Sequence, residues 1–98
     1  MPVMTIVKPG LYKDSVNLMR IAEAAAALEG VRRAALVMGT AANKAILDEA
    51  GQLTDEARAA GPDDLVVVLE AESDQALADA SARVEAMLAG DEAEGGGT

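Results

Sequence analysis

The 98-residue sequence contains no cysteine, no histidine, no phenylalanine and no tryptophan, and Tyr12 is its one aromatic side chain. Without cysteine, disulfides and thiolate metal sites are excluded. Without histidine, the chain lacks the commonest acid–base group, the commonest zinc ligand and any phosphohistidine chemistry. We therefore expect no catalytic residues and no metal site on this chain, and no activity from it alone.

Basic residues are also scarce, and the formal net charge is −9 at pH 7. A chain this acidic is repelled by phosphate backbones, so we expect no nucleic-acid partner. Residues 1–47 carry six basic and three acidic side chains, whereas residues 48–98 carry two basic and fourteen acidic ones. This polarity is typical either of an oriented docking surface or of a solvated surface with an acidic tail.

Long apolar runs are missing as well. None approaches the ~20 residues that a membrane span requires, and no signal-peptide pattern opens the chain. We therefore predict a cytoplasmic protein without a membrane partner.

Hydrophobic periodicity predicts elements in the order β-α-β-α-β-α. The predicted strands cover residues 4–7, 31–38 and 65–69. The predicted helices cover residues 15–29, 41–50 and 74–89, with a short helical turn within 53–60. The unbroken apolar run of the third strand is typical of a central strand covered on both faces.

Strands linked by helices favour a parallel or mixed sheet. We therefore predict a small two-layer α/β domain over residues 1–89, with a three-stranded mixed or parallel sheet. Such a narrow sheet leaves at least one edge exposed, where another chain could pair. Residues 90–98 are acidic and rich in glycine, and we predict a flexible tail or linker there.

The turn after the second strand carries one group of polar residues. Gly39 and Thr40 lead into a helix N-terminus, where free N–H groups and the helix dipole favour an anion. Asn43 and Lys44 lie within the first turn of that helix and could add an amide and a charge. Ordinary capping by Thr40, with Lys44 on the surface, explains the same pattern, and both interpretations stay open.

A second polar group, Tyr12-Lys13-Asp14-Ser15, follows the first strand. If the two strands run parallel, both turns lie at one end of the sheet, where α/β proteins usually bind ligands. Instead of binding a ligand, Asp14 or Ser15 could cap the helix that follows. Tyr12 could fill part of the core or anchor an interface. The candidate ligand- or partner-binding residues are Tyr12, Asp14, Ser15, Gly39, Thr40, Asn43 and Lys44.

Three segments resemble the FdrA family. Residues 8–19, KPGLYKDSVNLM, are similar to the KxGxYxDSVxLM opening of FdrA proteins, and residues 38–47, MGTAANKAIL, to their MGTxxNKxxL segment. Residues 61–67, GPDDLVV, are similar to their GPNDLVV segment, with Asp63 in place of the usual asparagine. The similarity extends from about residue 6 to residue 88 and covers only the N-terminal module of full-length FdrA proteins.

FdrA proteins are related to succinyl-CoA synthetases, and some are linked to an oxamate carbamoyltransferase. The resemblance implies a non-catalytic domain or small subunit of an FdrA-type, acyl-CoA-synthetase-like complex, linked in some members to carbamoyl transfer. It implies ligase-like or carbamoyltransferase subunits as partners, or self-association. The resemblance implies no cofactor on this chain. It implies that CoA or a phosphorylated ligand would be bound elsewhere in the complex.

Two alternatives stay open. One is a regulatory module that binds an anionic metabolite without any ligase partner. The other is an enzyme completed by self-association, with Lys44 and Asp14 as its reactive pair.

Overall fold

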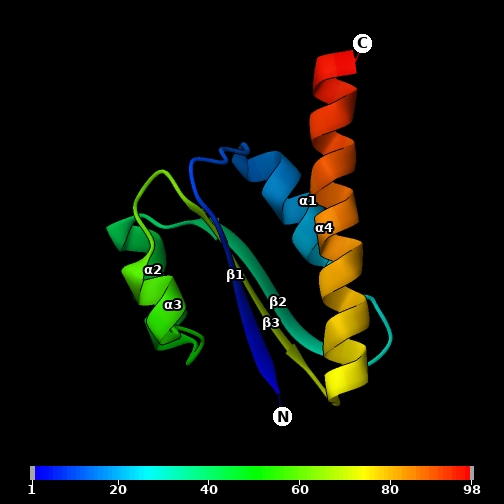
Figure 1. Ribbon diagram of the computed structural model, residues 1–98. Helices are drawn as coiled ribbons and strands as arrows, with labels where there is room; N and C mark the ends of the chain where they lie inside the picture. The colour runs from blue at the N-terminus through cyan, green and yellow to red at the C-terminus, as the bar shows by residue number, and fades with distance from the viewer. Residues whose placement is uncertain (1, 98) are drawn as a thin grey trace.

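The computed structural model describes the backbone of residues 2–97 and the side chains of residues 2–89. This part of the chain has three strands and four helices (Figure 1). They are β1 (Val3–Lys8), α1 (Ser15–Ala26), β2 (Val31–Met38), α2 (Ala41–Glu49), α3 (Asp55–Ala59), β3 (Leu65–Ala71) and α4 (Asp74–Gly97). The predicted α/β alternation is confirmed, and the short turn predicted within 53–60 is the separate helix α3.

The strands form one sheet in the order β1-β3-β2, and both outer strands run antiparallel to β3. At the centre, Val67 lies opposite Ile6 of β1 and Leu36 of β2. The sheet is therefore antiparallel, and the predicted parallel or mixed pairing is wrong.

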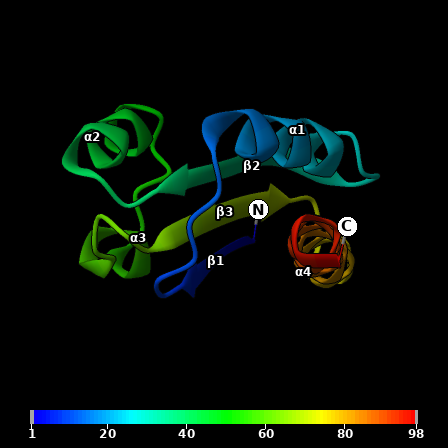
Figure 2. The ribbon, with the colours of Figure 1, turned by 90° about the horizontal axis from the view of Figure 1, so that it is seen from above.

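The physical reason lies in how the chain crosses the sheet. β1 and β2 do point the same way, and α1 crosses over between them as in a β-α-β unit (Figure 2). They are separated by one strand position, and the chain returns through α2 and α3 to insert β3 there in the opposite direction. This arrangement is a split β-α-β sheet.

Helices cover both faces of the sheet, with α1 and α4 on one side and α2 and α3 on the other (Figure 1). Alternate residues of β3 serve the two faces: Leu65, Val67 and Leu69 pack toward α1 and α4, whereas Val66 and Val68 pack toward α2 and α3. All five are at most 1% exposed. The prediction of a central strand covered on both faces is confirmed, but the helices α2 and α3 add a third layer to the two that were predicted.

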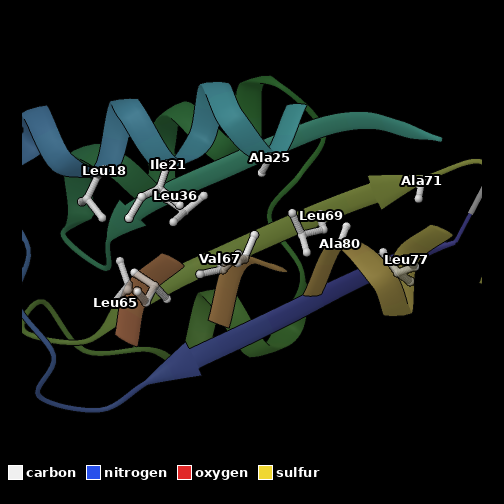
Figure 3. Packing of buried hydrophobic residues seen from close by; sticks show 12 residues of the cluster. Leu18, Ile21, Ala25, Leu36, Leu65, Val67, Leu69, Ala71, Leu77 and Ala80 are labelled. Atoms are coloured by element: carbon white, nitrogen blue, oxygen red, sulfur yellow. The ribbon is translucent and has the colours of Figure 1, made fainter. Parts of the chain in front are cut away.

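The larger core lies between β3 and the pair α1 and α4 (Figure 3). Leu18 and Ile21 on α1, and Leu77 and Ala80 on α4, repeat at helical spacing and are all buried against Val67 and its neighbours. Burying a leucine or isoleucine side chain fully contributes roughly 1.5–3 kcal/mol. These stripes therefore hold α1 and α4 on the same face.

Side-chain caps set where the first three helices begin. Asp14, Thr40 and Thr54 each accept a hydrogen bond from the backbone N–H three residues later, at 2.9, 3.2 and 3.2 Å. Asp14 rather than Ser15 is therefore the cap of α1. Each cap satisfies a backbone donor that the helix itself leaves unpaired, which is typically worth ~1 kcal/mol.

The last helix, α4, has 24 residues. The predicted tail at residues 90–98 lies outside the side chains that the structure describes, so the division of the chain at residue 89 stays a prediction. Among the described residues, no helix is both long enough and apolar enough to cross a bilayer.

Candidate functional site

A pocket of about 340 Å³ lies at the end of the sheet where β1 and β2 lead into their helices. Because β1 and β2 point the same way, the turns after both strands reach this end. The pocket is lined by Tyr12, Lys13, Ser15, Leu18 and Met19 from the first turn and α1, by Leu36–Met38 of β2, and by Thr40 and Asn43. Residues from both polar groups of the sequence therefore line one pocket.

Four of the seven predicted residues line this pocket: Tyr12, Ser15, Thr40 and Asn43. Tyr12 is 71% exposed and stands at its rim. Thr40 also caps α2, and the Asn43 side-chain amide donates a hydrogen bond to the carbonyl of Met38 at 2.9 Å. Thr40 and Asn43 therefore shape the β2–α2 turn as well as lining the pocket.

Asp14 and Gly39 contribute to the fold beside the pocket. The Asp14 carboxylate accepts hydrogen bonds from the backbone N–H of Asn17 at 2.9 Å and from its side-chain amide at 3.3 Å. At Gly39, a Cβ atom would lie 2.4 Å from the carbonyl oxygen of Gly61. Gly39 therefore allows the β2–α2 turn to approach the turn that precedes β3.

Lys44 points to α3, and the structure does not place it in the pocket lining. Its ammonium donates a hydrogen bond to the carbonyl of Arg58 at 2.8 Å and a shorter one to the carbonyl of Ala60. These carbonyls lie at the C-terminal end of α3, where a cation is favourable. Lys44 thus fastens α2 to α3, and Asp14 is engaged separately at the start of α1.

Asp64 connects three turns at this end of the sheet. Its carboxylate accepts hydrogen bonds from the backbone N–H groups of Gly61 at 2.9 Å and Gly10 at 3.1 Å, and its carbonyl accepts one from Gly39 at 2.9 Å. The bond from Gly61, followed by that from Gly10, lowers the pKa of Asp64. Gly61 is three residues away, but Gly10 and Gly39 are distant along the chain, so no local pattern in the sequence signals this role of Asp64.

Lys13 is the functional candidate that the sequence prediction left out. It is only 9% exposed, and it lines the pocket. Among the described side chains and backbone, Lys13 has no hydrogen-bond acceptor and no ion-pair partner. Its place between Tyr12 and Asp14 was the available signal, but a lysine in a turn is ordinarily exposed.

Exposed apolar side chains lie on the elements that form the pocket, and Tyr12 and Met19 also line it. On α1, Val16 and Met19 are 72% and 63% exposed and lie three residues apart on one helix face, and Tyr12 in the turn before α1 is 71% exposed. On α2, Ile46 is 61% exposed and lies one turn beyond Asn43. Between the two helices, β2 forms one edge of the sheet, with a strand on one side only. We call Tyr12, Val16, Met19, Ile46 and the outer edge of β2 the apolar rim.

The fold and the pocket define a small α/β domain with a split β-α-β sheet and a pocket at one end of that sheet. The chain belongs to the family described as AllF, heavy metal-associated domain, which matches residues 1–98. A curated relative, the uncharacterized protein YahF of Escherichia coli K12, is 41% identical over 73 residues. That similarity covers 74% of this chain but only 14% of YahF. No solved structure matches the chain.

The family description names heavy metals, but the donor atoms of this chain do not fit such an ion. Thiolate and imidazole are the ligands that soft and borderline transition metals prefer, and the sequence has neither cysteine nor histidine. Among the described residues, no three acidic side chains form a group that could hold a metal ion. The one charged side chain lining the pocket, Lys13, is a cation. We therefore derive no metal chemistry for this chain.

Proposed function

We propose that this chain is a non-catalytic docking domain or small subunit of an FdrA-type, acyl-CoA-synthetase-like assembly in the cytoplasm. In this proposal the apolar rim binds a ligase-like chain of that assembly. CoA or a phosphorylated ligand is bound by the partner, and the assembly is linked to carbamoyl transfer.

The observation that carries the proposal is the contrast between the apolar rim and its polar neighbours. Asp14 and Lys44, the reactive pair of the enzyme alternative, are engaged in contacts within the domain, as is the Asp64 carboxylate. Four large apolar side chains of the rim are instead more than 60% exposed. Exposed apolar groups gathered beside an open strand edge are typical of a surface for protein association.

The extent of the family match supports a ligase-like occupant rather than a second copy. The family covers this whole chain, whereas the matched segment is 14% of YahF. In such a relative, a domain of this kind accompanies a much longer chain. The FdrA-like segments point to the same context, because FdrA proteins carry ligase-like domains after this module.

Light scattering coupled to size-exclusion chromatography tests the proposal, with the chain alone and mixed with an FdrA-type ligase-like chain. We expect a stable complex, and we expect no ligase or carbamoyl-transfer turnover by the isolated chain. Met19→Glu and Ile46→Glu should each weaken the complex, because a charge would be buried in an apolar interface. Val3→Glu is the matched control, because Val3 is an exposed apolar residue on the opposite edge strand, β1.

Three outcomes would contradict the proposal. If the chain does not bind the ligase-like partner but forms a dimer through the apolar rim, self-association would be favoured. A complex disrupted by Val3→Glu and not by the rim variants would move the interface to β1. Turnover by the isolated chain, abolished by Lys44→Met or Asp14→Asn, would favour the self-associating enzyme.

The alternative of a regulatory module for an anionic metabolite has one observation in its favour. The pocket contains a buried lysine without a described partner, and its lining contains no carboxylate. Such a module would respond to an anion in the absence of any ligase-like chain.

A further inference from the structure

We infer that the pocket formed by the β1–α1 turn, the end of β2 and the start of α2 binds a small organic carboxylate, with the Lys13 ammonium as its counter-charge. The site does not depend on the docking proposal, because it lies within this single chain.

The first argument is the state of Lys13. A lysine is almost never buried unless its charge is paired, because removing the ammonium from water costs free energy. Lys13 is 9% exposed, and no described residue accepts a hydrogen bond from it or forms an ion pair with it. The other lysines differ: Lys8 pairs with Glu85, and Lys44 donates to two carbonyls. Its stem is buried, but Nζ is not among the fully enclosed unpaired polar atoms of the described residues, so the ammonium keeps some access to solvent and is available to an anion that enters the pocket.

The second argument is the character of the pocket around Lys13. Hydroxyl groups from Tyr12, Ser15 and Thr40 line it, and each can donate a hydrogen bond to an anion. The helix α2 begins at this pocket, with the neutral Thr40 as its cap and no acidic residue in its first turn. Its positive dipole end is therefore not neutralised. The nearby Asp14 carboxylate is engaged by Asn17.

The size and lining of the pocket indicate the class of anion. The volume of about 340 Å³ lies at the small end of the range for ligand pockets. Leu18, Met19 and Leu36 form an apolar part of the lining, next to a single cation. A phosphate dianion would bring two charges to one lysine and leave the apolar surface unfilled. A monocarboxylate with a short alkyl chain matches both the single charge and the apolar surface.

The test is an NMR titration of the purified chain with sodium butyrate, followed through the backbone amide signals. Butylamine, which has the same alkyl length and a positive charge, tests whether the anion matters, and inorganic phosphate tests the class of anion. Lys13→Met removes the charge and keeps most of the side-chain volume. Lys8→Met is the matched control, because it removes an equal charge at a lysine outside this pocket.

We expect butyrate to shift amide signals of residues 12–15 and 38–43 in the wild-type chain and in Lys8→Met. In Lys13→Met its affinity should fall by about tenfold or more, because a charge-assisted hydrogen bond is lost. Thermal melting gives a second measurement that does not depend on the NMR signals. Butyrate should raise the melting temperature of wild type and of Lys8→Met, and should leave that of Lys13→Met unchanged.

Four results would overturn the inference. The first is the absence of shifts at tens of millimolar butyrate. The second is an unchanged affinity in Lys13→Met, and the third is equal binding of butylamine. Binding of phosphate without binding of butyrate would overturn the assignment to a carboxylate. Failure to bind a ligase-like chain would leave these results untouched, because the titration contains no partner.

Discussion

Replacing Gly39 with alanine tests the close approach of two turns at the pocket end of the sheet. Gly39 does not have a positive φ, so its backbone conformation alone would allow any residue. What excludes a side chain is the neighbouring turn. An added Cβ would lie 2.4 Å from the carbonyl oxygen of Gly61 and 3.3 Å from the Cβ of Ala60. The backbone of one turn must therefore move.

The magnitude follows from two opposing effects. A glycine-to-alanine change at an ordinary φ in open space stabilises a protein by about 0.4–1 kcal/mol, because the unfolded chain loses freedom. Relief of the clash requires the two turns to separate, which stretches the 2.9 Å hydrogen bond from Gly39 to the carbonyl of Asp64. Overpacking of this kind costs about 1–3 kcal/mol. The net expectation is a destabilisation of roughly 1–2 kcal/mol.

Thermal and urea denaturation followed by circular dichroism measure this change. We expect the melting temperature of Gly39→Ala to fall by about 5–15 °C, given ~4–8 °C per kcal/mol for a domain of this size. Gly51→Asn is the control: Gly51 has a φ of +75° and no atom within 4 Å of an added Cβ, and asparagine tolerates that conformation. It should melt close to wild type. A Gly39→Ala variant as stable as wild type, or more stable, would refute the close approach.

Two further predictions concern the polar contacts at the same end. Lys44→Met removes two hydrogen bonds to carbonyls at the end of α3. The free energy of unfolding, measured by urea denaturation, should fall by about 1–2 kcal/mol, and the affinity for butyrate should not change. Unchanged stability would mean that these hydrogen bonds contribute nothing. Folding lowers the pKa of Asp64 below its ordinary value of 3.8. The ionised carboxylate therefore stabilises the native state fully at a pH above 3.8, and this stabilisation is lost as the pH falls through the lower pKa of the folded state. Asp64→Asn should therefore melt lower than wild type at neutral pH, and the difference should shrink in the acid range; a constant difference would rule out the charge as the cause.

The candidate site was predictable in part. The turns at Tyr12–Ser15 and Gly39–Lys44 were recognisable because each follows a strand and carries cap residues, which are local signals. Their meeting at one pocket also followed from the expectation that the first two strands run parallel. The roles within the group were not predictable. Lys44 contacts carbonyls fourteen and sixteen residues further along, and Lys13 lines a pocket that α1, β2 and the start of α2 also form.

The sequence by itself determined the local elements of this protein. Caps such as Asp14 and Thr40 act over three residues, and helical stripes repeat every three or four, so a short window of sequence carries the whole signal. The apolar run of residues 65–69 likewise predicted a strand buried on both faces. Absences in the composition excluded thiolate and imidazole chemistry without reference to any fold.

Only the tertiary structure decided the direction of β3, the third layer and the contacts of the charged residues. Strand direction depends on where a connection crosses the sheet, and residue spacing does not encode this. β3 pairs with β1 and β2 across separations of tens of residues, and Asp64 reaches Gly10 over fifty-four. The pocket likewise forms only where the β1–α1 turn, α1, the end of β2 and the start of α2 come together, and this places Lys13 in its lining.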